Sequence, residues 1–259
     1  MTNSRRGVGL ITRFFEWFGG IGAFCGNLAR TAISPPYEWA ELLRQCDSIG
    51  ALSLPLVALA GGATGVVLSM EMREGLMRFG AGGMLPSIIV FSILRESGPI
   101  ITGLIVSGRV GAGIGAELGS MRVTEQIDAM DASGVDPFRY LVATRVVACM
   151  LMLPLLTLAA DFFGVLMGWV ANTLQHPISL QLFIQNGFND VGFSDFLPPT
   201  FKTMFYGLII GVISCFEGMR TSGGTEGVGR ATTRSVVLSS LFVILADVLL
   251  VRLILEIFP

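Results

Sequence analysis

Long apolar stretches alternate with short polar segments along this chain, and the pattern predicts a bundle of membrane-spanning helices. No charged residue occurs between Ser48 and Met70. At about 1.5 Å per helical residue, such a run can cross a hydrocarbon core of about 30 Å. Four further stretches are long enough, at about 80–108, 146–174, 199–216 and 235–257. The sequence therefore predicts an all-α, polytopic membrane protein with five transmembrane helices.

The first 46 residues mix apolar, aromatic and charged positions. Arg5 and Arg6 precede an apolar stretch as in a signal peptide, but Arg13 and Glu16 interrupt it. We favour an interfacial helix, whose apolar residues enter the lipid boundary while its arginines meet headgroups. Those apolar residues are Leu10, Ile11, Phe14, Phe15, Trp17 and Phe18.

A second short polar helix is expected after Pro35-Pro36, carrying Trp39, Glu41 and Arg44. Residues 1–46 then form an N-terminal unit of amphipathic helices, and residues 47–259 form the five-span membrane unit.

Composition narrows the functional classes. Hydrophobic residues make up 52% of the chain, charged residues 14%, and the mean hydropathy is +0.71, which is typical of an integral membrane protein. A net charge of −2, with arginines scattered singly, argues against a nucleic-acid partner. The four cysteines are far apart, and His176 is the only histidine, so neither a metal site nor nucleophilic catalysis is expected.

Basic residues predict the orientation, because cytoplasmic segments retain arginine and lysine. With the N-terminus in the cytoplasm, the outer side receives only Arg73, Arg78, Lys202 and Arg252. Five crossings then place the C-terminus in the periplasm.

Small residues recur every four positions in the second span, at Ser107, Gly111, Gly115 and Gly119, and predict close helix packing. The glycines superficially resemble a nucleotide-binding loop. However, the only lysine is Lys202, so no GxxxxGK[ST] motif exists. We therefore expect no ATP hydrolysis by this chain, and no enzymatic activity of its own.

An amphipathic charged helix is predicted next, at about 121–133. Its apolar face carries Val123, Ile127 and Met130, and Arg122, Glu125 and Asp128 lie elsewhere around it. Gly134 can end the helix, and Pro137 prevents its continuation. It is either a surface connector or a coupling helix whose apolar side chains enter a groove on an ATPase. The segment's length and a second Arg/Gly-rich segment on the same side favour coupling.

That second segment, residues 222–231, is typical of a flexible turn. Its position makes Gly229 and Arg230 a second candidate contact with an ATPase, and Thr232-Thr233 are candidate caps of the last span.

Several motifs resemble those of the MlaE family of ABC lipid-transport permeases. They are Leu94-Arg95-Glu96-Ser97-Gly98-Pro99, Gly108-Arg109, the block from Ala116-Glu117-Leu118-Gly119 to Asp128-Ala129-Met130, and Gly227-Val228-Gly229-Arg230-Ala231-Thr232-Thr233-Arg234. The resemblance covers nearly the whole chain from about residue 45. Ser97 is one departure, since the family commonly has leucine there.

The resemblance implies a homodimer in a Gram-negative inner membrane that moves phospholipid between the inner and outer membranes and so maintains outer-membrane lipid asymmetry. It implies two ABC ATPase subunits that bind the ATP and Mg²⁺, often a STAS-domain subunit, and a periplasmic hexamer of an Mce-domain protein. Segment 121–133 would be the coupling helix, with Glu117 as a further coupling residue. The first two spans of each protomer would line the lipid cavity.

Arg95 and Glu96 lie well inside the second span, where an ionised side chain is expensive. With Ser97 they are candidates for a lipid cavity or gate, although each charge could instead pair with another helix. Neighbours on a helix point about 100° apart, so we do not expect Arg95 and Glu96 to pair with each other. Asp161 and Asp247 are candidate partners of Arg95 or Arg145. An ion-gradient-driven carrier or channel, using Glu96, Asp161 and Asp247 as a relay, is the alternative function.

Overall fold

Helices, and no strands, make up the secondary structure of the part that the computed structural model describes, residues 3–33, 38–175, 177–189 and 191–257. Five segments are long and apolar enough to cross a membrane, at residues 39–78, 82–123, 138–174, 193–219 and 224–257. This confirms the predicted all-α, five-span architecture. His176 and the side chains that precede Phe15 lie outside the described part.

The spans differ in how continuous their helices are. The first, fourth and fifth are single helices: α2 (Trp39–Arg78), α9 (Phe193–Met219) and α10 (Gly224–Ile257). The third joins a π-helical turn, η4 (Phe138–Ala143), to α7 (Thr144–Gln175). The second runs through η1 (Gly82–Met84), α3 (Leu85–Ser92), η2 (Ile93–Ser97), α4 (Gly98–Val106), η3 (Ser107–Gly111) and α5 (Ala112–Val123). It has two π-helical turns, η2 before α4 and η3 at the start of the glycine-rich ridge, and it stays helical through both.

The short polar helix predicted after Pro35-Pro36 is not separate from the first span, because α2 runs from Trp39 to Arg78 without a break. The charged residues of its first turns find partners on the protein. Glu41 is buried, accepts a hydrogen bond from Gln45 at 2.7 Å and a longer one from Tyr140 at 3.3 Å. Paired in this way, these polar turns extend the first span instead of forming a separate helix.

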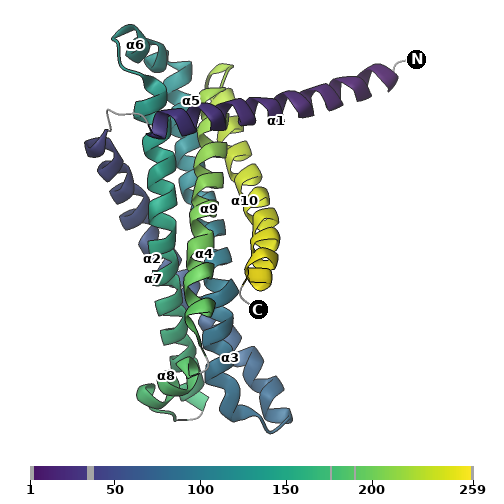
Figure 1. Cartoon of the computed structure of the whole chain (residues 1–259), viewed down its shortest axis with the longest axis vertical. Helices are drawn as coiled ribbons and strands as arrows, with labels where there is room; N and C mark the ends of the chain where they lie inside the picture. The colour runs from purple at the N-terminus through teal and green to yellow at the C-terminus, as the bar shows by residue number, and fades with distance from the viewer. Residues whose placement is uncertain (1–2, 34–37, 176, 190, 258–259) are drawn as a thin grey trace.

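The two ends of the bundle are built differently (Figure 1). At one end, α1 (Asn3–Ile33) crosses the bundle and the short helix α6 (Gln126–Ala132) projects beyond it, and this is called the α6 end below. The other end carries α3 and α8 (Leu180–Phe188). The Trp17 indole donates a hydrogen bond to Glu217 at 2.8 Å, and the Phe24 ring contacts the ring of Phe138. The arrangement suits the predicted interfacial helix.

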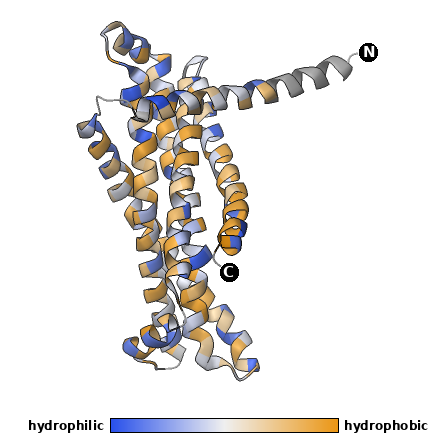
Figure 2. Ribbon diagram, in the orientation of Figure 1, coloured by the Kyte–Doolittle hydropathy of each residue, from blue (hydrophilic) through white to orange (hydrophobic). Residues whose placement is uncertain are grey.

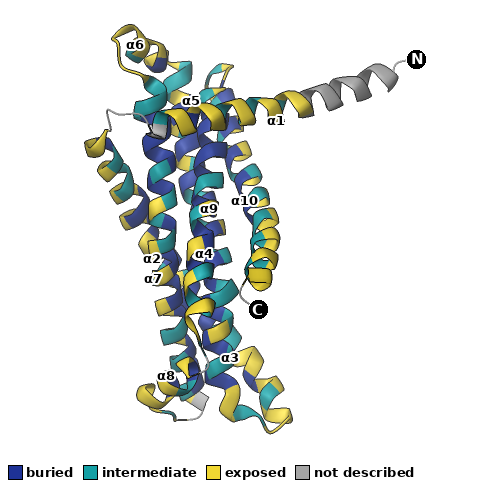
Figure 3. Ribbon diagram, in the orientation of Figure 1, coloured by how far each residue is buried: buried dark blue, intermediate teal, exposed yellow. Residues whose placement is uncertain are grey.

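Small residues set the distances between the helices of the core. In α2, a Cβ atom at Gly61 would lie 2.5 Å from the carbonyl oxygen of Ala160 in α7. In the predicted ridge, a Cβ atom at Gly115 would lie 2.5 Å from the Ser235 hydroxyl of α10. The ridge therefore packs within the chain, as predicted. Exposed apolar residues are frequent on α10, which is largely orange in Figure 2 and has much exposed ribbon toward its C-terminal end in Figure 3.

Two glycines of α2 should respond to the same substitution with opposite signs. Gly61→Ala forces a methyl group against the α7 backbone, so we expect it to destabilise the protein by about 1–3 kcal/mol. Nothing lies within 4 Å of a Cβ atom at Gly75, so Gly75→Ala should stabilise the helix by about 0.5–1 kcal/mol. Thermal unfolding of the purified chain measures both, and equal shifts would contradict the packing described.

Candidate functional site

The π-helical turn η2 presents two charged side chains in the middle of the second span. The backbone N–H of Gly98 bonds to the carbonyl of Ile93, and Pro99, the next residue, has no N–H to donate. Gly98 also permits a close approach of α7, since a Cβ atom there would overlap the Asp161 carboxylate. The turn therefore carries Arg95 and Glu96 at a place where the helix is already irregular.

Lys202 is the centre of the charged cluster. Its side chain is 2% exposed, and its ammonium group lies 2.9 Å from Glu96 Oε2 and 3.0 Å from Asp247 Oδ1. The Tyr206 hydroxyl donates a short hydrogen bond to the same Asp247 oxygen. Three spans meet here, because Glu96 is in η2, Lys202 and Tyr206 are in α9, and Asp247 is in α10.

Within the cluster, the Lys202 side chain is buried and the Glu96 side chain is partly exposed. The Glu96 side chain is 42% exposed, whereas that of Asp247 is 17% exposed. Two carboxylates face one ammonium group, so the cluster has a formal charge of −1. Phe201 and Phe205 on α9 and Val248 on α10 are exposed near these residues in sequence. A carboxylate beside apolar surface can bind the polar part of a molecule whose remainder is apolar.

Arg95 has a separate set of contacts. Its guanidinium lies 3.4 Å from Asp195 at the start of α9 and 5.1 Å from the centre of the Phe91 ring. Arg95 and Glu96 therefore do not pair with each other, as predicted. Ser97 is half-buried and makes no side-chain hydrogen bond within the described part of the chain.

The predicted pairing of Asp161 and Asp247 with Arg95 or Arg145 is wrong. Arg145 pairs with Glu117, at 2.8 Å, and Asp247 pairs with Lys202. Both carboxylate oxygens of the buried Asp161 lack a hydrogen-bond partner among the described residues. Asp161 lies on α7 and has no ion pair with the Lys202 cluster, so the structure supplies no connected relay through the three acids.

Sequence reasoning missed Lys202, Tyr206 and Asp195. The sequence places Lys202 near the outer end of the predicted fourth span, but α9 begins at Phe193 and buries it. Glu96, on the second span, finds its partners on α9 and α10, and the lining of a lipid cavity by the first two spans stays a prediction. A single lysine in an apolar stretch, with two acids inside other spans, was the available signal. Their pairing depends on how the spans pack.

The predicted 121–133 helix consists of two helices. Helix α5 ends at Val123, Glu125 adopts a left-handed backbone with φ of 58°, and α6 begins at Gln126. As predicted, Gly134 ends α6. Its N–H bonds to the carbonyl of Asp131, and the next N–H bonds to that of Met130.

Some side chains of this segment are buried against the bundle, and others are exposed. Ile127 is 4% exposed and packs in the hydrophobic core, with Met130 partly buried beside it. Ile127 is therefore a packing residue of the permease and not an exposed apolar contact. Arg122 binds Asp128 at 2.5 Å, and Glu125 and Asp128 are exposed.

The second predicted contact segment is helical from Gly224 onward, and only residues 220–223 lie between α9 and α10. Gly223 and Gly224 have positive φ values, which allow this tight turn. Thr232 and Thr233 donate to carbonyls four residues earlier inside α10, so they do not cap it. Gly229 and Arg230 are exposed on α10, at the α6 end of the bundle (Figure 1).

Five apolar helical spans around a charged intramembrane cluster define a polytopic α-helical membrane protein. No group of three or more potential metal ligands occurs among the described residues. A family model described as Permease MlaE matches residues 42–253. The chain belongs to this permease family, and it is a transport component that resides in a membrane.

Relatives of similar length agree with this family. A probable ABC transporter permease protein of Rickettsia felis is 35% identical over 254 residues, 98% of each chain. One of Synechocystis is 35% identical over 79% of this chain and 78% of its own. The Arabidopsis thaliana protein TRIGALACTOSYLDIACYLGLYCEROL 1, chloroplastic, is 31% identical over 91% of this chain and 68% of its own.

Removing the central cation should destabilise the bundle. Lys202→Ala leaves two carboxylates close together without their shared partner, so we expect a loss of about 3–5 kcal/mol. Arg252→Ala is the control, because it breaks an ion pair whose side chains are 81% and 64% exposed, and should cost less than about 1 kcal/mol. Thermal unfolding in detergent compares the two, and similar losses would show that the Lys202 cluster does not tie the spans together.

Proposed function

We propose that this chain is the membrane subunit of an ATP-driven transporter that moves phospholipid between the inner and outer membranes of a Gram-negative bacterium. In this role it maintains the lipid asymmetry of the outer membrane. The observation that carries the proposal is the Lys202 cluster, which opens through Glu96 beside apolar surface. A phospholipid with an amine in its headgroup has the matching chemistry, since the cationic amine can bind the Glu96 carboxylate and the acyl chains are apolar. The name of the Arabidopsis relative also refers to a lipid.

The proposed orientation places the α6 end in the cytoplasm. Arginines gather there, at Arg122 and Arg139 around α6 and at Arg220, Arg230 and Arg234 around the α9–α10 turn. The positive-inside rule favours that side for them. The N-terminus is then cytoplasmic and the C-terminus periplasmic, in the inner membrane.

A second copy of the chain is the proposed cover of α10. Only 11% of the most apolar stretch of α10 is buried within the chain, compared with 56% for α9 (Figure 3). A homodimer would enclose the exposed side of α10 and, next to it, Glu96 and Asp247, which creates a cavity for lipid between the two protomers.

The remaining partners follow from the family. Two ABC ATPase subunits bind ATP and Mg²⁺ at the α6 end, and their contacts include the exposed residues of α6, with Gly229 and Arg230 nearby. A periplasmic hexamer of an Mce-domain protein receives the lipid at the opposite end, and a STAS-domain subunit completes the complex on the cytoplasmic side.

The first test of this function concerns Glu96. Glu96→Gln removes the exposed charge but keeps the size of the side chain, so we expect ATP-dependent lipid transfer by the reconstituted complex to fall by about tenfold or more. Glu256→Gln, in an exposed pair on α10, should leave transfer unchanged. Unchanged transfer in Glu96→Gln would contradict the proposed role of Glu96, and transport by the chain alone under an ion gradient would favour a carrier.

The second test separates coupling from folding at the α6 end. Glu125→Gly removes an exposed carboxylate and suits the left-handed backbone, so the turn should persist while lipid-stimulated ATPase activity falls by about tenfold. Glu74→Gly, at an exposed site near the C-terminal end of α2, is the control and should keep the activity. Full coupled activity in Glu125→Gly, with the complex intact, would remove this residue from the ATPase contact.

A further inference from the structure

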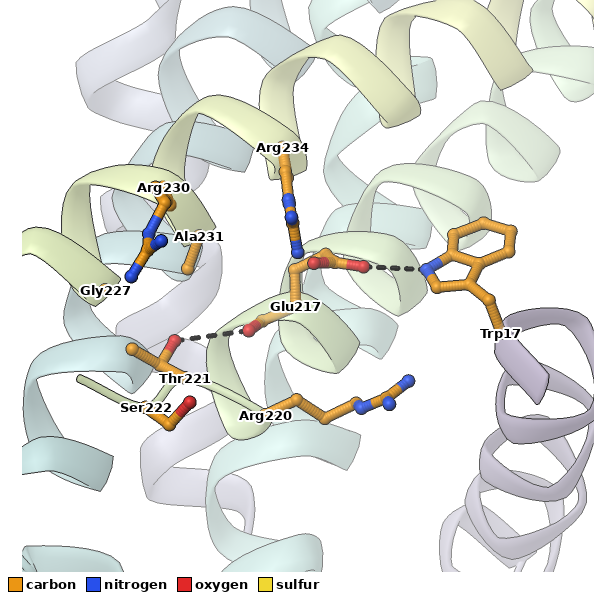
Figure 4. Close-up of a pocket in the computed structure, with 9 residues that line it drawn as sticks. All are labelled: Trp17, Glu217, Arg220, Thr221, Ser222, Gly227, Arg230, Ala231 and Arg234. Carbon is orange, nitrogen blue, oxygen red and sulfur yellow. Dashed lines mark hydrogen bonds between the residues drawn. The ribbon is translucent and has the colours of Figure 1, made fainter. Parts of the chain in front are cut away.

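A second charged site lies at the α6 end, apart from the Lys202 cluster. A cavity of about 320 Å³ opens between Trp17 of α1, the last turn of α9 and the first turns of α10 (Figure 4). Fifteen residues of α9 separate Lys202 from Glu217 in the wall of this cavity, which is about 22 Å along a helix. The two sites are therefore distinct, and none of the contacts of the Lys202 cluster involves this cavity.

Three arginines line the cavity, namely Arg220, Arg230 and Arg234, together with one acid, Glu217. We refer to it as the arginine pocket. Figure 4 shows Arg230 and Arg234 extending from α10 toward the end of α9. The lining carries a formal charge of +2, so it is complementary to an anion.

The arginines are poorly neutralised by the protein itself. Arg220 and Arg234 make no ion pair with any residue that the structure describes. Arg230 lies 3.8 Å from Glu226, but that acid is 81% exposed and the pair is largely screened by solvent. Their guanidinium groups therefore retain hydrogen-bond donors for a ligand.

Glu217 has another role in the pocket. It is 8% exposed and accepts the hydrogen bond from the Trp17 indole at 2.8 Å, so it attaches α1 to the end of α9. Arg220 packs on the other side of this contact, with its guanidinium 4.8 Å from the centre of the Phe216 ring. The pocket is thus built around the joint between the crossing helix and the bundle.

Uncharged donors complete the lining. Gly227 in the first turn of α10 lines the pocket, and a helix N-terminus carries unpaired N–H groups and a partial positive charge. Ser222 adds a hydroxyl group from the turn. Arginine forks and helix N-termini are the two arrangements that proteins use most readily for phosphate oxygens.

The position of the pocket favours a lipid as the source of the phosphate. Helix α1 crosses the bundle where the spans end, and Phe15 and Phe18 on it are exposed, at 68% and 43%. An amphipathic helix in this position lies at the level of the headgroups. The phosphates of membrane lipids occupy that level, within reach of the arginines.

We propose that the arginine pocket binds the phosphate group of an anionic lipid at the membrane surface. The bound lipid bridges α1 and the α9–α10 turn, and it adds to the contact between Trp17 and Glu217. The site recognises a lipid that stays with the protein, so it is independent of the proposed transport route through Glu96.

The test is lipid binding to the purified full-length chain without ATP. Native mass spectrometry would count phosphatidylglycerol and phosphatidylcholine retained from mixed micelles, for the wild type and for Arg230→Gln/Arg234→Gln. We expect the wild type to prefer phosphatidylglycerol, and the double variant to lose about tenfold or more of that preference. Arg78→Gln/Arg252→Gln, which removes two exposed and paired arginines elsewhere, is the matched control and should behave as the wild type.

Three results would overturn the proposal. One is equal retention of phosphatidylglycerol by the wild type and the pocket variant. Another is displacement of the lipid by inorganic phosphate at an equal concentration, which would indicate a site for a soluble anion. The third is normal lipid retention by the pocket variant while the ATPase subunit fails to co-purify with this variant from the whole complex, which would make the pocket a protein contact. Thermal unfolding checks that each variant is folded. Failure of the proposed lipid transport would not affect this test, because the test measures lipid retention without ATP.

Discussion

An ammonium group inside a membrane bundle needs carboxylates around it, because there is little water to solvate the charge. Lys202 obtains one from Glu96 and one from Asp247, and so links the second, fourth and fifth spans. Tyr206 adds a hydrogen bond to Asp247 from one turn further along α9. These contacts require the three spans to keep their depth and rotation relative to one another. The exposed part of Glu96 is held in place by the same contacts.

The first and third spans are held together by a different kind of contact. Small residues such as Gly61 let α2 approach the α7 backbone, without any ion pair between the described residues of the two helices at that point. The only charged group nearby on α7, Asp161, is buried against Gly98 and lacks a hydrogen-bond partner in the described part. Close packing therefore joins the first and third spans at this point, whereas the second and fifth spans combine small-residue packing with the paired charges of the Lys202 cluster.

Charge also separates the functions of the two regions of α9 and α10. Near the middle of these helices, acids outnumber the single lysine, and the cluster is closed except at Glu96. At the α6 end, three arginines outnumber Glu217 around a pocket that includes α1. One site suits the polar group of a passing molecule, and the other suits an anion that stays at the surface. The α6 segment lies at the same end of the bundle, where Ile127 secures it to the permease core.

The sequence by itself determined the class, the five spans, the packing role of the Gly111 and Gly115 ridge, and the end of α6 at Gly134. These features depend on local hydrophobicity, residue size and backbone preference, which a single stretch of sequence contains. Tertiary structure alone decided that Lys202 is buried between Glu96 and Asp247, and that Ile127 faces the core. Such pairings join residues far apart in the chain, and they depend on the rotation and depth of each helix in the bundle. Hydropathy and spacing within one helix do not specify those two quantities.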